Sequence, residues 1–267
     1  MIKFSIITCT YNAAETLQRT LDSVRQQSYA YVEHIIQDGC STDDTLQLAK
    51  AYQQQCLDTD DAPEVCIASE PDKGLYDAMN RAMTRATGDY VLFLNAGDTF
   101  PSADTLETVA ASVGEDETLP AVLYGDTDIV DDDGHFVRHR RLSPPDKLSW
   151  KSFKKGMLVC HQAFYARADL AKATPYDNVR YRFSADVDWC IRIMRRAEEE
   201  HLPLRRVQAV VANYLDGGMT NQNHRASLIE RFNVMRRHYG IVTTLAWHVW
   251  FILRQTMTSI LPPRGLQ

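Results

Sequence analysis

A single acidic residue directly after an apolar run is the first candidate for chemistry in this sequence. The run Tyr90–Leu94 leads into Asn95, Ala96, Gly97 and Asp98. Five consecutive apolar residues after a turn predict a central strand that is buried on both faces. The carboxyl end of such a strand opens onto the crevice where α/β proteins bind ligands, and Gly97 would let the backbone approach a ligand closely. The competing interpretation of Asp98 is a helix cap or a turn residue.

Three more apolar segments in the first half end in polar loops. The segments are Lys3–Thr8, Val32–Gln37 and Val65–Ala68, and the loops are Thr10–Asn12, Asp38–Asp44 and Glu70–Gly74. Helical spacing of apolar residues follows each loop, and we expect Asn12 with Glu15 to form a capping box and Ser41 or Thr42 to cap the second helix. Four strands alternating with three helices predict a largely parallel sheet with right-handed crossovers.

The pattern changes after residue 125. From residue 103 onwards we expect a helix over 103–113, strands over 121–126, 136–141, 158–165 and 207–214, and a helix over 186–200. The acidic run Asp131–Asp133 before Gly134 predicts a hairpin turn. Gly217 and Gly218 form a turn or a loop in which the backbone can approach a ligand. Helices over 224–239 and 241–260 make a tail, so we divide the chain into residues 1–125, 126–220 and 221–267.

Composition indicates a globular chain with a substantial core. It has 267 residues, 45% of them hydrophobic. The cysteines, at positions 9, 40, 56, 66, 160 and 190, form no CxxC pair and no zinc-like spacing with histidine, so we expect reduced, buried thiols in a cytoplasmic protein. The first residues run straight into a strand, which predicts that no signal peptide directs export.

The tail differs from the rest of the chain in charge. The net charge is −6, but from Met219 onwards six arginines face the single acid Glu230, giving +5 there and −11 before it. The helix over 241–260 is rich in Trp and other apolar residues, yet His248 interrupts it and the run is too short to span a bilayer. Two interpretations remain: the tail lies on the inner face of the cytoplasmic membrane, or it packs on the body or a second subunit.

Four motifs at strand ends together resemble the family 2 glycosyltransferases, which have the GT-A fold. They read SIITCTYN from Ser5, QDGCSTD from Gln37, EPDKGLYDAMN from Glu70 and FLNAGD from Phe93. Three later segments, CHQAFY from Cys160, SADVD from Ser184 and DGGMT from Asp216, resemble bacterial members that build colanic-acid-type exopolysaccharide. The resemblance implies a Rossmann-like, mostly parallel sheet with helices on both faces, a nucleotide-sugar half, a smaller mixed acceptor-side half and a helical tail.

The resemblance also implies a donor site and a metal site. The residues implied to hold the nucleotide sugar are Cys9, Thr10, Tyr11, Asn12, Asp38, Gly39, Lys73, Gly74, Asn80, Asn95, Ala96, Gly97 and His161. Asp98 matches the last acid of the DxD-type motif and would bind Mg²⁺ or Mn²⁺, hard cations that prefer oxygen ligands. The chain departs from the family pattern at Asn95 and Gly97, where many relatives have aspartate, and at Cys9, where proline is usual.

Asp186 matches the family's catalytic base. An inverting transfer needs one carboxylate to take the proton from the attacking acceptor hydroxyl, and a helix N-terminus would lower the pKa of that carboxylate. Asp188 then serves as an acid at the start of the helix, and Arg192 pairs with an acid or a phosphate or is structural. His161 lines the acceptor or diphosphate pocket, or is a hydrogen-bonded structural histidine.

The resulting hypothesis is an inverting glycosyltransferase that uses a UDP- or GDP-sugar. Its acceptor would be a saccharide or lipid-linked saccharide, with no nucleic acid as partner. The alternative is a non-catalytic nucleotide-sugar-binding or scaffold protein of a polysaccharide assembly complex. A dinucleotide-dependent oxidoreductase fits less well because no GxGxxG follows the first strand. A sugar nucleotidyltransferase would need a loop rich in glycine and lysine there, and the sequence has Thr10–Ala13 instead.

Overall fold

In the computed structural model, one eight-stranded sheet organises the chain. The structure describes residues 1–114, 118–217 and 224–260. The strands are β1 (Phe4–Thr10), β2 (Val32–Asp38), β3 (Glu64–Ser69), β4 (Tyr90–Phe93), β5 (Val122–Val130), β6 (Phe136–His139), β7 (Phe164–Arg167) and β8 (Leu204–Leu215). Their order is β3-β2-β1-β4-β7-β5-β6, with β8 also paired to β5. The predicted central strand is thus confirmed, because β4 lies between β1 and β7.

The sheet is parallel in its first half and mixed in its second. β1, β2, β3 and β4 pair in parallel, as do β5 and β8. β7 runs antiparallel to both β4 and β5, and β6 runs antiparallel to β5. The carboxyl ends of β1, β2, β3 and β4 therefore meet at one edge, as the alternation of strands and helices predicts.

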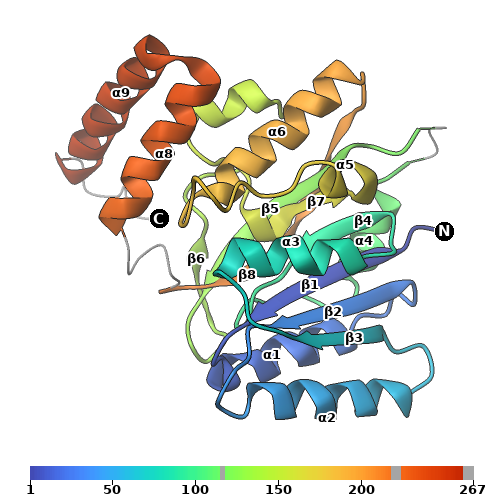
Figure 1. Ribbon diagram of the computed structural model, residues 1–267. Coiled ribbons are helices and arrows are strands. Elements are labelled where there is room, and N and C mark those ends of the chain that lie inside the picture. Colours follow the sequence, from blue (N-terminus) through green and yellow to red (C-terminus); the bar gives the residue numbers. More distant parts are fainter. Residues whose placement is uncertain (115–117, 218–223, 261–267) are drawn as a thin grey trace, which may run out of the picture.

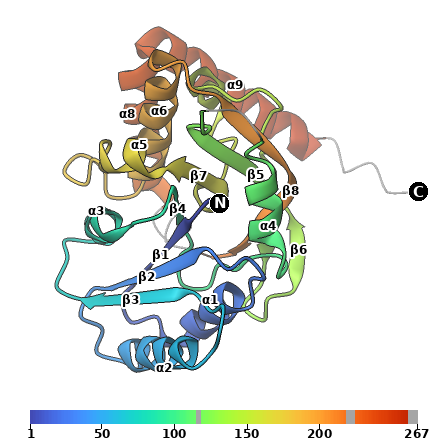
Figure 2. The ribbon, with the colours of Figure 1, turned by 90° about the vertical axis from the view of Figure 1, so that its right-hand side faces the viewer.

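Helices cover both faces of the sheet (Figures 1 and 2). α1 (Ala14–Arg25) and α2 (Thr45–Leu57) lie on one face, and α3 (Leu75–Arg85) lies on the other. Adjacent residues of β2 show why: Ile35 joins the core cluster under α3, whereas Ile36 joins the cluster of α1 and α2. Successive side chains of a strand point to opposite faces, so a strand covered on both sides must be apolar throughout.

The second half adds shorter elements around the sheet. They are α4 (Thr105–Ala111), the 3₁₀ helices η1 (Trp150–Lys155) and η2 (His161–Ala163), α5 (Ala168–Lys172) and α6 (Ala185–Glu199). The tail consists of α8 (His224–Tyr239) and α9 (Ile241–Ile260), which lie beside α6 at the end of the molecule away from α2 (Figure 1). None of the helices in the described ranges is long and apolar enough to cross a membrane.

Three local expectations are wrong. Asn12 does not cap α1: its backbone is left-handed, with φ of 48°, and its side-chain oxygen accepts from Thr42 N–H across to the neighbouring loop. α2 has Asp44 at its N-cap, where the structure shows no side-chain cap bond, so neither Ser41 nor Thr42 caps it. The expected strand over 158–165 begins only at Phe164, because the tight turn of η2 precedes it.

The tail packs on the body through α8 and is exposed along α9. Tyr239 in α8 stacks on Trp150 of η1, with ring centroids 5.6 Å apart. His248 of α9 meets Phe232 of α8 edge to face at 5.0 Å. In contrast, Val242, Leu245 and Val249 of α9 are 79%, 51% and 57% exposed. One tail helix is therefore part of the body, and the other leaves an apolar stripe at the surface.

Candidate functional site

A cavity of about 1090 Å³ opens at the sheet edge where β1 and β4 end. Its lining combines the loop after β1, the turn after β4 and the start of α3 with η2, α6 and α8. Residues that are far apart in sequence, such as Tyr11, Asp98 and Asp186, therefore face one space. A crevice at the carboxyl ends of parallel strands is where the fold class binds its ligands.

Asp98 lies at the inner wall of this cavity and is 3% exposed. One carboxylate oxygen accepts from Gln162 Nε2 at 2.8 Å and the other from Leu215 N–H at 2.9 Å. Burial raises the pKa of Asp98 to about 7, and these two hydrogen bonds only partly oppose the rise. The carboxyl group therefore changes charge near neutral pH unless a cation stabilises its ionised form.

Asn95 belongs to the same tight turn, which the Asp98 N–H closes on the Asn95 carbonyl at 2.9 Å. Its side-chain oxygen is buried and has no hydrogen-bond partner among the described residues. Burying an oxygen acceptor without a partner is costly, so this atom is available to a ligand. Asn95 and Asp98 together place oxygen atoms on the cavity wall, and oxygen atoms are the ligands that hard divalent cations prefer.

Gly97 has a packing role in the turn after β4. Its φ is +100°, and a Cβ there would come within 2.5 Å of the Leu215 side chain, so glycine is needed to pack this turn against β8. Gly97 is not part of the cavity lining that the described residues form. The expectation that it lets the backbone approach a ligand stays a prediction.

Asp186 stands in the first turn of α6, half-buried, and lines the cavity. Its Oδ1 accepts from the Tyr76 hydroxyl at 3.1 Å, so a residue of α3 orients a carboxylate of α6. Burial and the neighbouring Asp186 charge raise the pKa of Tyr76 well above its usual value, so Tyr76 stays a hydrogen-bond donor. The second carboxylate oxygen has no hydrogen-bond partner among the described residues and is left for a ligand.

An aromatic cluster surrounds His161 and packs against Tyr76. His161 stacks on Phe93 at 5.1 Å, and Tyr176 stacks on Trp189 at 4.9 Å and on Tyr76 at 5.4 Å. His161 is 5% exposed and its Nε2 hydrogen-bonds the Tyr176 hydroxyl at 2.6 Å. Burial lowers the pKa of His161 to about 4, so the imidazole is neutral. His161 thus lines the cavity and is also hydrogen-bonded within the core.

Asp188 joins α6 to the tail. Its carboxylate is fully buried and bonds Arg192 Nε at 2.6 Å and His238 Nε2 at 2.8 Å. Burial alone would raise the pKa of Asp188, but the His238 hydrogen bond and the Arg192 charge outweigh it and hold the pKa below its usual value. Asp188 and Arg192 are therefore structural partners that anchor α8.

Glu230 of α8 fixes the segment that leads into α6. Its carboxylate accepts the backbone N–H groups of Arg182, Phe183 and Ser184 at 2.9, 2.8 and 2.9 Å. A carboxylate there satisfies donors that would otherwise lack partners and complements the positive end of the helix dipole. The tail thereby holds the backbone two residues before Asp186.

The expected site residues separate into two groups. Those that line the cavity are Cys9, Thr10, Tyr11, Gly39, Gly74, Asn95, Ala96, Asp98, His161 and Asp186. The residues that do not belong to the cavity lining formed by the described part of the chain are Asn12, Asp38, Lys73, Asn80 and Gly97. Asp38 is fully buried, and its oxygens accept from the hydroxyls of Thr10, Ser41 and Ser69, so it connects the end of β1, the loop after β2 and the end of β3. Asn80 bonds the backbone of Tyr176, and Lys73 is exposed.

Residues that the sequence analysis did not single out also face the cavity. They include Tyr76, Gln162, Arg138, Arg182 and Arg231. Tyr76 and Gln162 fall inside quoted motifs, so the motifs pointed to the right segments without assigning these side chains. The position of Arg231 depends on how α8 docks, for which the sequence carries no local signal. Gly217 lines the cavity, and Gly218 lies outside the described residues.

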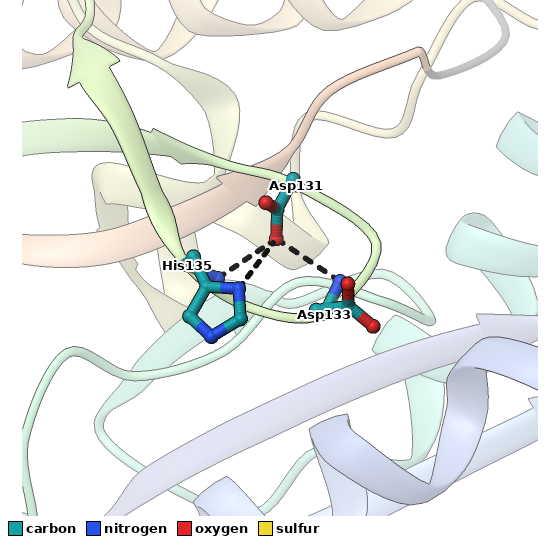
Figure 3. A group of neighbouring side chains, drawn as sticks. All are labelled: Asp131, Asp133 and His135. Carbon is teal, nitrogen blue, oxygen red and sulfur yellow. Dashed lines mark hydrogen bonds and ion pairs between the residues drawn. The ribbon is translucent and has the colours of Figure 1, made fainter.

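One acidic group elsewhere has the composition of a metal site. Single ligand atoms of Asp131, Asp133 and His135 lie within 4.8 Å of one another at the β5–β6 turn (Figure 3). All three side chains are exposed, and Asp131 Oδ1 already accepts the backbone N–H groups of Asp133 and His135. These are the bonds of a hairpin turn, which confirms the sequence prediction for this segment.

All six cysteines are free thiols. Four are buried, whereas Cys40 and Cys66 are exposed, so the expectation of burial is wrong for these two. Cys40 has a positive φ of 62° in the loop after β2, and Cys66 lies on β3 at the edge of the sheet.

Comparison with known proteins agrees with this architecture. The model of the family described as "Glycosyl transferase family 2" matches residues 5–173. A "PGL/p-HBAD biosynthesis glycosyltransferase" of Mycobacterium bovis is 38% identical over 220 residues, which cover 82% of this chain and 79% of that protein. A putative teichuronic acid biosynthesis glycosyltransferase, TuaG of Bacillus subtilis, is 38% identical over 94 residues, 35% of each chain.

Solved structures share the fold at low sequence identity. S. aureus TarS 1–349 in complex with UDP-GlcNAc matches with a TM-score of 0.68 at 20% identity, covering 88% of this chain and 65% of that one. The mannosyltransferase PcManGT from Pyrobaculum calidifontis, in complex with GDP-Man and Mn²⁺, matches with a TM-score of 0.60 at 16% identity, covering 88% and 64%. The expected GT-A fold is confirmed. By its family model and its relatives, the chain belongs to glycosyl transferase family 2 and is a glycosyltransferase.

Proposed function

We propose that this glycosyltransferase moves a sugar from a UDP- or GDP-linked donor to an acceptor hydroxyl with inversion at the anomeric carbon. The observation that carries the proposal is that Asp98 and Asp186, from the two halves of the chain, line the same cavity. In this proposal residues 1–125 bind the donor and residues 126–220 face the acceptor. Structural neighbours solved in complex with UDP, UDP-GlcNAc or GDP-Man support a nucleotide-sugar donor.

The loop after β1 is suited to the donor base. Tyr11 is 64% exposed and lines the cavity, so an aromatic side chain is available for stacking on a nucleobase. Gly39 lies beside it, with Tyr11 Cδ2 within 3.4 Å of where a Cβ would stand. Asp38 is fully buried and holds both loops through hydrogen bonds from Thr10 and Ser41, and its contact with the donor's base or ribose stays a prediction.

A divalent cation, Mg²⁺ or Mn²⁺, fits the turn after β4. Asp98 offers carboxylate oxygens and Asn95 a buried amide oxygen without a partner among the described residues. With one carboxylate in this turn, the donor's phosphates would complete the coordination. When bound, such a cation neutralises charge on the diphosphate that leaves. Gln162 and the Leu215 N–H each donate to one oxygen of the Asp98 carboxylate and so fix its orientation.

Asp186 is the proposed catalytic base. Its free oxygen takes the proton of the acceptor hydroxyl while that oxygen forms a bond to the anomeric carbon. The bond from the anomeric carbon to the diphosphate breaks on the opposite side, and the electron pair leaves with the nucleoside diphosphate. Tyr76 donates to the other oxygen and so fixes the orientation of the carboxylate.

A binding screen tests the donor proposal. The purified protein is titrated with UDP- and GDP-sugars by calorimetry in the presence of Mn²⁺, Mg²⁺ or chelator. We expect one nucleotide to bind, and binding to weaken in chelator because the diphosphate then loses a counter-charge. If no nucleotide sugar bound under any of these conditions, the donor proposal would be wrong.

The acceptor belongs, in this proposal, to a cell-surface glycan, either exopolysaccharide or glycolipid. Relatives are named for PGL/p-HBAD and teichuronic acid biosynthesis, which supports a saccharide or lipid-linked saccharide acceptor. We further propose that the tail meets the inner face of the cytoplasmic membrane. The exposed stripe of Val242, Leu245 and Val249 supports this, as does the absence of any acid in the sequence after Glu230, where five arginines follow.

The membrane proposal predicts that Leu245→Gln/Val249→Gln loses co-sedimentation with vesicles. Two exposed apolar side chains no longer enter the lipid interface, while the α8 contacts of the tail are untouched. The vesicles contain phosphatidylglycerol and are compared with phosphatidylcholine alone. Leu57→Gln/Val179→Gln is the matched control, since these side chains are 75% and 92% exposed outside the tail. Equal sedimentation of wild type and the α9 variant would contradict membrane contact through α9.

A further inference from the structure

Four arginines line the cavity in addition to Arg140. Arg138 lies on β6, Arg141 follows it, Arg182 precedes α6 and Arg231 comes from α8. We call these four residues the arginine wall. They come from three separate segments of the chain, and the fold brings them around a single space of about 1090 Å³.

The charges of the arginine wall are not neutralised within the described residues. The structure shows no ion pair for Arg138, Arg141 or Arg231 there, and Arg182 lies over its neighbour Phe183, 5.8 Å from the ring centroid. Arg231 Nε is buried without a hydrogen-bond partner. A structural arginine in the same region behaves differently: Arg140 donates to the carbonyls of Leu142, Met157 and Leu158. Arg138, Arg141 and Arg182 are exposed and Arg231 is half-buried, so the four guanidinium groups remain accessible to a ligand, and an anion would also give the buried Arg231 Nε a partner.

The donor alone does not account for the arginine wall. The proposed diphosphate position is the turn after β4, in the first half, where a cation would supply the counter-charge. β6 is separated from β4 along the sheet by β7 and β5. Arg182 lies three residues before the start of the helix that carries Asp186, and Glu230, the neighbour of Arg231, fixes that same segment. The wall therefore belongs to the acceptor side of the site.

We propose that the arginine wall binds an anionic group of the acceptor, either a phosphate or a carboxylate. The planar guanidinium fork matches both anions with two parallel hydrogen bonds. This inference rests on the proposed function and narrows its acceptor to a negatively charged saccharide or a saccharide on a phosphate-bearing lipid.

The test uses protein saturated with the nucleoside diphosphate that binds in the donor screen, together with Mn²⁺. Glucose 1-phosphate, glucuronate and methyl glucoside are then titrated by calorimetry at low and high salt. We expect the anionic sugars to bind about tenfold more tightly than methyl glucoside, with the advantage reduced at high salt. Preference for glucose 1-phosphate over glucuronate would identify a phosphate, and the reverse a carboxylate.

Variants of the arginine wall test whether its residues cause the preference for anionic sugars. Arg138→Gln/Arg141→Gln should remove most of the advantage of the anionic sugars. Arg25→Gln/Arg196→Gln, which removes the same charge from arginines paired with Asp22 and Glu200 outside the cavity, should keep it. Equal binding of anionic and neutral sugars to wild type would overturn the inference. A loss of nucleoside diphosphate affinity in Arg138→Gln/Arg141→Gln would also overturn it, because the wall would then serve the donor. If the nucleoside diphosphate did not bind even to wild type, the proposed function itself would fail.

Discussion

Asp186→Asn is expected to lower the rate of sugar transfer by about 10²- to 10⁴-fold while leaving donor affinity nearly unchanged. The amide has the shape of the carboxylate and can still accept from Tyr76, but it cannot take the proton from the acceptor hydroxyl. The measurement pairs steady-state rates, once a donor is known, with calorimetric binding of that donor. Asp186 is half-buried at the start of α6, so the variant should fold normally.

The matched control is Asp132→Asn, which removes one negative charge from another residue of the same cavity lining. It should leave the rate within a few-fold of wild type, because it changes the charge of the cavity without removing the group that accepts the proton. If Asp186→Asn kept the wild-type rate, another group would have to accept the proton. A loss of donor binding in Asp186→Asn would place this residue in the donor site instead.

The second large effect is expected at Asp98. In the folded protein, burial raises the pKa of Asp98 from 3.8 to about 7, so a cation must compete with a proton for the carboxylate. Donor binding in Mn²⁺ should therefore strengthen as the pH rises from 6 to 8 and level off above the pKa. Asp98→Asn should lose both the Mn²⁺ dependence and this pH dependence, since an amide does not titrate. Calorimetry with the donor in Mn²⁺ and in chelator measures both effects.

The same group makes the stability of the metal-free protein depend on pH. Because the pKa is higher in the folded state, the folded chain holds this proton more tightly than the unfolded chain does. Its contribution is complete below pH 3.8 and is lost as the pH rises toward about 7. Asp98→Asn should remove that fall in the free energy of unfolding, measured by urea denaturation with chelator. A Mn²⁺-supported donor affinity that stayed flat across this range in wild type would contradict the role of Asp98.

The sequence predicted the first half of the fold well because its signals are local. Apolar runs such as Tyr90–Leu94 identify strands that are buried on both faces, and polar loops mark the edge where those strands end. The expected helix caps are wrong because long-range contacts, and not the local sequence, determine the conformation of the loops before the helices. Asn12 bonds Thr42 across to another loop, which is a long-range contact without a local signature.

The site was predicted as segments rather than as side chains. Motif residues such as Asp98 and Asp186 do face one cavity, but Asp38 is withdrawn from it by its hydrogen bonds to Thr10, Ser41 and Ser69. Whether an acid points into a cleft or ties loops together depends on its neighbours in space. The roles of Glu230 and Arg231 were not foreseen because they depend on how α8 docks on α6, which Asp188 and His238 fix from within.

The most direct test of the account is a donor titration of wild type, Asp98→Asn and Asp186→Asn side by side in Mn²⁺. If the cavity is a nucleotide-sugar site with a cation at Asp98 and a base at Asp186, wild type and Asp186→Asn should bind the donor with similar affinity. Asp98→Asn should bind it more weakly, and no better in Mn²⁺ than in chelator. Wild-type affinity in Asp98→Asn, still dependent on Mn²⁺, would show that the cation lies elsewhere and would contradict the proposed site.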